Sequence, residues 1–166
     1  QNYNHPADID QDLLRQFFRD LTYLDKPFFF VGTTQEKPVF QYKEIERLVP
    51  SVFAALNNAD SNQRVHFTSF NYGQDFLLPK RRITQGVIFL DSNNRLNIAF
   101  SWINQPDEFD EMAREYRSET PGEPLEIEDS AKTLRAYLPY MQQTRFKSGK
   151  PAPMWIKAEL DNMGRQ

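Results

Sequence analysis

The sequence contains no cysteine. Disulfide bridges, thiolate metal sites and thiol catalysis are therefore excluded, although this absence does not fix the cellular compartment. Only six glycines are present, and none has the spacing of a phosphate-cradling loop. The two histidines are His5, which we expect in a flexible end, and His66, which we expect on a strand. Neither accompanies a glycine-flanked nucleophilic serine, and two histidines without cysteine do not favour zinc.

Long hydrophobic runs are also missing. The longest, Phe28 to Val31, is far shorter than the roughly 20 residues that cross a bilayer. No secretory signal is recognisable at the start of the sequence. The chain opens on Gln1 rather than Met. This is compatible with a chain that was cut at this point, or with an exported protein whose signal, and whose lipid-bearing cysteine, lie upstream of Gln1.

The charges are nearly balanced, with 20 basic and 23 acidic residues and a net charge of −3. Such a surface has no global attraction for nucleic acid, so we expect no nucleic-acid partner. The 166 residues fit a single domain, 1–166. The 14 Phe, 7 Tyr and 2 Trp indicate a packed core rather than a disordered chain.

Two segments show helical periodicity. Apolar residues recur at helical spacing between Asp8 and about Leu24, and Asp8 with Gln11 has the spacing of a capping pair. The same periodicity runs from Glu44 to Asn58, interrupted by Pro50 on its polar side. We therefore predict a helix over 8–24, and over 44–58 either a kinked helix or two abutting helices.

The period changes to two after residue 63. Strands are predicted over 64–70, 83–90 and 95–103, with shorter ones at 28–31, near 37–40 and over 154–160. The turn residues 91–94 join two alternating runs and predict a hairpin, whereas 71–79 is predicted to be a loop. On the second hairpin strand one face is predicted to be core; it comprises Leu96, Ile98, Phe100 and Trp102.

The remainder of the chain is less regular. We predict that the sheet ends at Pro106, followed by a short helix from Asp107 to about Arg117 and a loop over 118–124. Residues 125–141 suit a helix except for Pro139. The predicted fold class is α+β: an antiparallel sheet with a central hairpin, packed against two amphipathic helices.

Acidic side chains form the densest charge cluster. Asp107, Glu108, Asp110 and Glu111 could surround a calcium ion, but the alternating loop of an EF-hand is missing. We favour a solvated helix start and predict no metal site. Further along, Glu126 and Glu128 would share a face on a strand and could form a catalytic carboxylate pair; two solvated surface acids are the simpler interpretation.

Basic residues gather twice. One cluster is Lys80-Arg81-Arg82; the other comprises Arg145, Lys147 and Lys150. Phosphate or anionic lipid would suit both, but charges flanking a strand more often discourage edge pairing. The run Phe28-Phe29-Phe30 could form an exposed partner surface, and we favour its burial in a central strand.

Three stretches resemble a loose group of uncharacterised bacterial cell-envelope lipoproteins. They are Lys37-Pro38-Val39-Phe40 leading into a helix, the hairpin runs Thr84 to Phe89 and Arg95 to Phe100, and Pro153-Met154-Trp155. Together they span 37–160. The resemblance implies an exported domain held by a lipid tether upstream of Gln1, periplasmic or associated with the outer membrane. It implies no reaction and no catalytic residues.

The leading hypothesis is thus a non-enzymatic cell-envelope module that binds or scaffolds another macromolecule, with another envelope protein as the expected partner. No catalytic, cofactor-binding or metal-binding residue is predicted, and no cofactor. Two alternatives stay open: a hydrolase that uses carboxylates such as Glu126 and Glu128, and a small-molecule-binding domain with an apolar cavity beneath the hairpin. A cytoplasmic location is the alternative to the envelope.

Overall fold

The computed structural model describes residues 3–25, 33–75, 78–107, 123–128 and 130–163. The elements in chain order are α1 (Gln11–Asp20), β1 (Thr22–Asp25), β2 (Gln35–Pro38), α2 (Tyr42–Asn58), β3 (Val65–Asp75), β4 (Leu78–Leu90), β5 (Arg95–Pro106), the 3-10 helix η1 (Pro124–Glu126), β6 (Lys132–Arg135), β7 (Met141–Arg145), β8 (Pro151–Glu159) and α4 (Leu160–Met163). No helix in these ranges is both long and apolar enough to cross a membrane.

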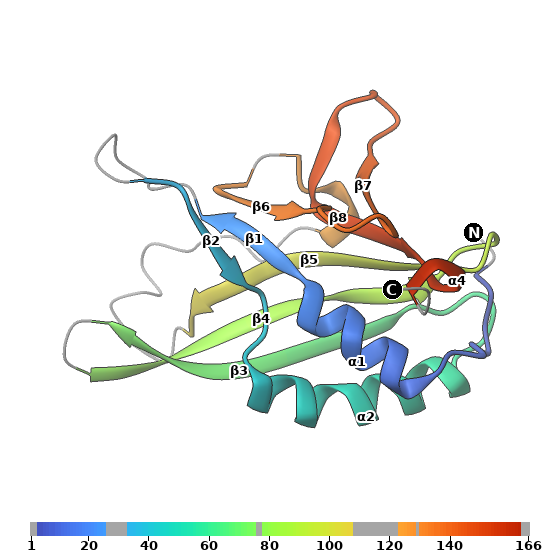
Figure 1. Ribbon diagram of the computed structural model, residues 1–166, viewed down its shortest axis with the longest axis horizontal. Helices are drawn as coiled ribbons and strands as arrows, with labels where there is room; N and C mark the ends of the chain where they lie inside the picture. Colours follow the sequence, from blue (N-terminus) through green and yellow to red (C-terminus); the bar gives the residue numbers. More distant parts are fainter. Residues whose placement is uncertain (1–2, 26–32, 76–77, 108–122, 129, 164–166) are drawn as a thin grey trace.

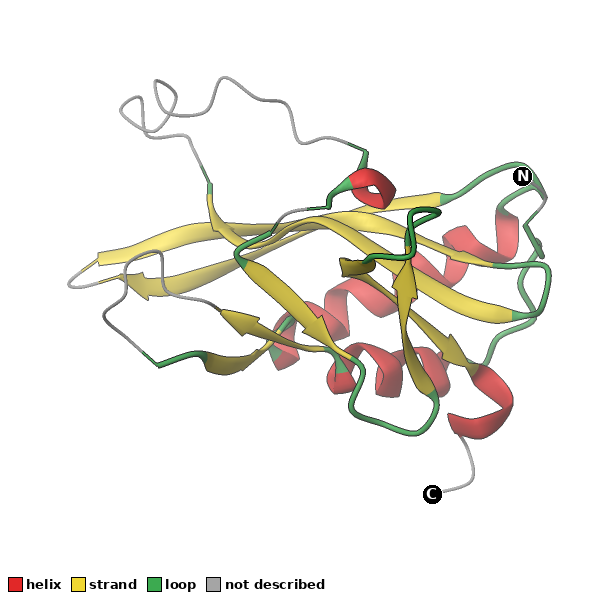
Figure 2. Ribbon diagram, turned by 90° about the horizontal axis from the view of Figure 1, so that it is seen from above, coloured by secondary structure: helices red, strands yellow, loops and turns green. Residues whose placement is uncertain are grey.

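Two antiparallel sheets form the framework. The larger has the strand order β3-β4-β5-β8-β7, and the smaller has the order β2-β1-β6. Helices α1 and α2 lie along one side of the larger sheet, and η1 lies on the other (Figures 1 and 2). The predicted α+β class, with a central hairpin packed against two amphipathic helices, is confirmed.

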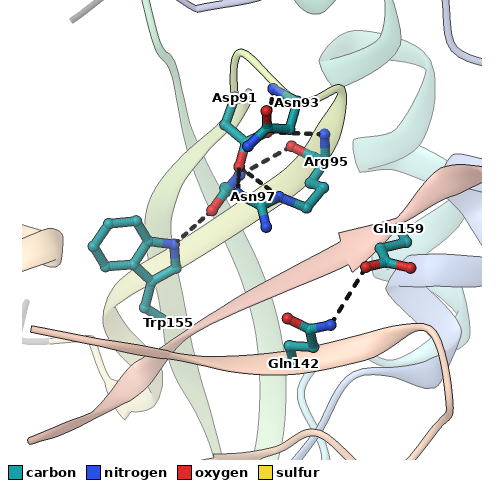
Figure 3. A network of polar contacts seen from close by, with 7 residues as sticks. All are labelled: Asp91, Asn93, Arg95, Asn97, Gln142, Trp155 and Glu159. Atoms are coloured by element: carbon teal, nitrogen blue, oxygen red, sulfur yellow. Dashed lines mark hydrogen bonds and ion pairs between the residues drawn. The ribbon is translucent and has the colours of Figure 1, made fainter. Parts of the chain in front are cut away.

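The hairpin between β4 and β5 turns where the sequence predicted. The Asp91 carboxylate accepts from the backbone amides of Asn93 and Arg95 at 3.0 and 3.1 Å, and from Arg95 Nε at 2.9 Å (Figure 3). Asn94 adopts a positive φ of 58°, which asparagine tolerates better than most residues. One aspartate therefore fastens both sides of the turn. Next to it, Trp155 of β8 donates from Nε1 to Asn97 Oδ1 at 3.1 Å.

The predicted core face of β5 holds for its first half only. Leu96, Ile98 and Phe100 are fully buried, but Trp102 is half-buried and Ile103 takes the next core position. The reason is a shift in pairing: Gly86 faces Phe100, whereas Gln85 faces Trp102. The extra residue of this β-bulge exchanges the two faces of the strand, so the prediction for Trp102 was wrong.

Helix α1 is shorter than the predicted 8–24. It begins after Asp10, whose carboxylate accepts from the amides of Asp12 and Leu13 at 2.7 and 3.2 Å, so Asp10 rather than Asp8 is the N-cap. It ends at Asp20 because β1 pairs on both sides, with β2 and with β6. Leu24 is therefore a strand residue.

Helix α2 is one element, so the alternative of two abutting helices was wrong. It runs from Tyr42 to Asn58 with Pro50 inside it, on the exposed side. Its apolar stripe points into the core, where Val49 and Leu56 have no exposed surface. Burial of this stripe outweighs the hydrogen bond that proline cannot make.

Two further predictions were wrong. The predicted loop 71–79 is largely strand, because β3 and β4 stay paired from Val65 opposite Ile88 to Asp75 opposite Leu78. The helix considered for 125–141 is absent: η1, β6 and the start of β7 occupy that segment. The predicted strands near 37–40 and over 154–160 correspond to β2 and β8. The strand predicted at 28–31 and most of the helix predicted at 107–117 lie outside the described residues.

The inner face of the larger sheet carries the main core. Its centre is a cluster of rings, Phe18, Phe40, Phe67 and Phe100, with centroids 5.1 to 6.3 Å apart. Gly86 lies beside this cluster, and only a glycine fits there, because a Cβ would lie 2.3 Å from the Ala99 carbonyl oxygen and 3.1 Å from Phe67 Cζ. The outer face has a smaller cluster of Val87, Phe89 and Ala99, against which Tyr3, Leu125 and Trp155 pack.

Candidate functional site

Beyond the phenylalanine layer, the inner face of the larger sheet turns polar. Along β3 the inward positions after Phe67 are Ser69 and Asn71, and opposite Ser69 on β4 lies Thr84. All three polar residues are buried, with exposed fractions of 6%, 6% and 0%. This polar end of the sheet lies at the N-terminal end of α2, and the β3–β4 hairpin extends past it (Figure 1).

Glu44 is the centre of the polar end. Its carboxylate, with 2% exposure, accepts from the Gln41 amide at 2.8 Å, from Ser69 Oγ at 2.7 Å and from Asn71 Nδ2 at 3.1 Å. The first contact satisfies a free amide at the start of α2, and the other two tie the helix to β3. The glutamate thus positions the helix end against the sheet.

Asn71 is buried and incompletely bonded. Its Nδ2 donates to Glu44 Oε2 and, at 3.3 Å, to Asn104 Oδ1, which fixes the orientation of the amide. Its Oδ1 is buried and accepts no hydrogen bond from the described residues. A buried acceptor without a donor costs free energy, so this oxygen is a place where a ligand donor would be stabilised.

Cations hold the β5 backbone just past the bulge. Asn104 has a positive φ of 49°, and its carbonyl accepts from Arg82 Nη1 at 2.9 Å and from Lys132 Nζ at 3.3 Å. Lys132 also donates to the Ile103 carbonyl and lies 5.5 Å from the ring centroid of Tyr23. These contacts fix the strained residue and link β5 to the smaller sheet.

Two recesses open between α2 and β3. The smaller, about 230 Å³, is lined by Glu44, Arg47, Leu48, Ser51, Thr68, Ser69 and Phe70. The larger, about 570 Å³, is lined by Gln41, Lys43, Glu44, Arg47, Phe70, Asn71, Tyr72 and Arg81. Because they share Glu44, Arg47 and Phe70, we treat them as one feature, the α2–β3 groove.

The groove is basic and aromatic. Arg47 donates to the carbonyls of Phe70 and Lys43, and within the described ranges neither Arg47 nor Lys43 has a carboxylate partner. The Arg81 guanidinium lies 3.9 Å from the centroid of the Phe70 ring. Tyr72 is 69% exposed. An acidic ligand would find two unmatched cations here and aromatic surface beside them.

Of the two candidate acidic sites, the first lies mostly outside the described residues. Asp107 forms an ion pair with Arg81 at 2.9 Å, and Glu108, Asp110 and Glu111 lie outside the described residues. Glu126 is exposed in η1, and Glu128 pairs with Lys150 at 3.3 Å. The two glutamates therefore do not share one face of a strand, and both are exposed, as expected of two solvated surface acids. Within the described ranges no three His, Asp or Glu side chains gather as metal ligands.

The two basic clusters have different surroundings. Arg81 and Arg82 lie in β4 and have the contacts given above; the side chain of Lys80 is outside the described set. Arg145 donates to the Gly149 carbonyl at 2.9 Å and closes the turn between β7 and β8, near exposed Lys147. Among the described side chains of these clusters, only Arg81 lines the groove.

The histidines are not brought together. His66 lies on β3, exposed, beside a recess of about 270 Å³ on the outer face of the sheet. His5 is 8% exposed, so the prediction of a flexible end was wrong. Burial disfavours its cation and lowers its pKa below the usual value. Hydrogen bonds from Tyr3 N to Ser61 O and from Asn4 N to Leu90 O anchor this segment.

Sequence patterns did not identify Glu44 and Asn71, the two buried polar residues at the end of the groove, as site residues. Gln41 and Glu44 have the spacing of a capping box, which indicates a helix start but not the burial of its glutamate. Asn71 continues the alternation of Phe67 and Ser69, and this continuation was a signal that β3 extends beyond residue 70. Comparisons of the chain with family models, curated proteins and solved structures found no match.

Proposed function

We propose that this chain is a non-enzymatic binding module of the cell envelope, which holds another macromolecule in the α2–β3 groove. The observation that carries the proposal is the pair of cations, Lys43 and Arg47, that face the groove without a carboxylate partner in the described residues. Other arginines of the same two-helix layer are matched: Arg15 and Arg19 both lie within 4 Å of Glu46. Unmatched cations beside exposed aromatic surface favour recognition of an acidic partner.

The buried carboxylate supports binding rather than chemistry. Glu44 accepts three hydrogen bonds that hold α2 on β3, which is a positioning role. The envelope location rests on the resemblance of the hairpin and its flanking motifs to cell-envelope lipoproteins. The expected partner is accordingly another envelope protein.

A site-specific photo-crosslinker tests the proposal. Placed at Tyr72, on the groove, it is expected to give one discrete adduct in cells that express the tethered, full-length protein. Placed at Tyr137, which is 46% exposed and does not line the groove, it is expected to give none. Lys43→Glu should reduce the Tyr72 adduct, because it places a carboxylate against an acidic partner.

The outcome also separates the alternatives. Equal labelling at both tyrosines, or none at Tyr72, would contradict a macromolecular partner in this groove. Thermal stabilisation by a small metabolite, lost on Lys43→Glu, would favour the small-molecule-binding domain instead.

A further inference from the structure

The outer edge of β3 is long and weakly protected, with one carbonyl covered by Arg47 of α2. β3 is the first strand of the five-stranded sheet, with 11 residues, no proline, lysine or arginine, and unbroken pairing to β4. The opposite edge strand, β7, has five residues and a break in its register. The edges of the smaller sheet, β2 and β6, have four residues each, with Lys37, Pro38, Lys132 and Arg135 among them. Proteins usually blunt their edges by such means, so β3 is the exception here.

The direction of the β3 backbone can be derived from one contact. Arg47 Nη2 reaches the Phe70 carbonyl at 2.7 Å from α2, so this carbonyl points away from β4. In an antiparallel pair, the amide and carbonyl of one residue face the same side, and the side alternates along the strand. His66, Thr68 and Tyr72 therefore also direct their backbone groups outward. Within the described chain no backbone hydrogen bond reaches them from that side.

We infer that the β3 edge and the α2–β3 groove together accept an extended acidic peptide segment of a partner protein, which adds to the sheet as a strand beside β3. This inference rests on the proposed function and names its partner. An added strand gains main-chain hydrogen bonds from the edge and side-chain specificity from the groove beside it. Here the specificity is for carboxylates, since Lys43 and Arg47 lie on the helical wall of the groove.

Two groups are poised for such a ligand. Arg47 covers the Phe70 carbonyl, and a carboxylate that draws the guanidinium to itself leaves this carbonyl for a peptide N–H. Asn71, which lines the groove, has a buried Oδ1 with no donor in the described residues, and it accepts a second N–H or a hydroxyl of a ligand that displaces the atoms covering it. A peptide supplies both kinds of group at the repeat of a strand, whereas a simple anion supplies no donor.

The test uses fluorescence anisotropy of a labelled nine-residue peptide in which Val and Glu alternate. We expect saturable binding to the whole chain, and at least about tenfold weaker binding when Lys replaces Glu. Two peptides are N-methylated, each on a different set of alternate backbone amides. The one methylated on the amides that face β3 should not bind, because it loses those hydrogen-bond donors without a change in charge. Lys43→Glu should weaken binding, and the matched Lys147→Glu, in the turn between β7 and β8, should not.

A proline on the edge provides the second arm. Thr68→Pro removes an outward N–H that no residue in the described chain uses, so the fold should persist while peptide binding is lost. Thr68→Val, which keeps the N–H, is the control. Circular dichroism confirms that both variants are folded.

Three results would overturn the inference. If peptide binding needs Lys43 but is unaffected by N-methylation and by Thr68→Pro, the groove binds the peptide but the peptide does not add as a strand to β3. Absence of peptide binding together with a discrete Tyr72 adduct rejects the acidic strand and leaves the proposed function standing. A doubled mass in sedimentation, reversed by Thr68→Pro, would assign the edge to a second copy of this chain.

Discussion

Two substitutions of Glu44 distinguish the effect of its hydrogen bonds on stability from the effect of its charge. Its three donors are Gln41 N, Ser69 Oγ and Asn71 Nδ2. Glu44→Ala removes this acceptor at a position that is 2% exposed; Asn71 Nδ2 keeps its contact to Asn104 Oδ1, whereas the Gln41 amide and the Ser69 hydroxyl lose theirs. An unsatisfied buried donor costs about 1–3 kcal/mol, so we expect a loss of roughly 3–5 kcal/mol, allowing for partial access of water. A loss of this size lies in the range of the most damaging single substitutions.

Glu44→Gln should behave differently. Gln41 and Asn71 both donate to Oε2, so the amide oxygen can take that place and keep both contacts. The new NH₂ then faces the Ser69 hydroxyl, which can rotate to accept. We therefore expect a loss of about 1 kcal/mol, from the weaker acceptor strength of a neutral amide.

Urea unfolding followed by far-ultraviolet circular dichroism measures both variants, with the slope checked against the wild-type slope. An equal loss in the free energy of unfolding for Glu44→Ala and Glu44→Gln would mean that the charge of Glu44, not its hydrogen-bond geometry, stabilises the fold. A loss below 1 kcal/mol for Glu44→Ala would refute the anchoring role altogether. Glu46→Ala, on the exposed side of the same helix, is the control.

Three other perturbations follow from the fold. Gly86→Ala should destabilise by about 3 kcal/mol in thermal unfolding, because its Cβ would lie 2.3 Å from the Ala99 carbonyl oxygen; a loss under 1 kcal/mol would contradict the close approach. The pKa of His5 is lowered in the folded state, so the unfolded chain binds more protons and the free energy of unfolding falls as pH drops through 6.5. His5→Gln should make this fall between pH 7.5 and 5 less steep. An unchanged slope would exclude His5 as its source. Asp91 loses solvation on burial, but its hydrogen bonds from Arg95 and the backbone outweigh this and lower its pKa. The stability that Asp91 contributes is therefore present above pH 3.8 and lost as pH falls through the lower, folded-state pKa. Asp91→Asn should lower the free energy of unfolding by about 1–2 kcal/mol at pH 7. The same loss at pH 2.5 would show that it has another cause.

Local patterns predicted the elements whose cause is local. The period-two runs around Asp91 to Asn94 gave the hairpin, and the periodicity of α2 survived Pro50. The antiparallel α+β arrangement could be anticipated from these elements because amphipathic helices must cover one face of such a sheet.

Tertiary effects account for the errors. The bulge that displaces Trp102 occurs beside the close approach of Gly86 to the neighbouring strand, and neither feature leaves a mark in the periodicity of β5. Leu24 obeys helical spacing but joins β1 because two distant segments pair with it. The burial of Glu44, which sets the end of the groove, comes from its contacts with β3 and cannot be read from a helix start alone.

The polar half of the inner face has a consequence for how such a chain can change. Along β3 the core residue Phe67 comes before Asn71 and Tyr72, which line the groove; on antiparallel β4 the order is reversed, with Arg81 of the groove before Ile88 of the core. Unlike the buried Glu44, the exposed groove residues Lys43 and Tyr72 can be substituted without removing a core side chain. Preference for one partner over another can therefore drift or be redesigned while the phenylalanine layer, and with it the ability to fold, stays the same.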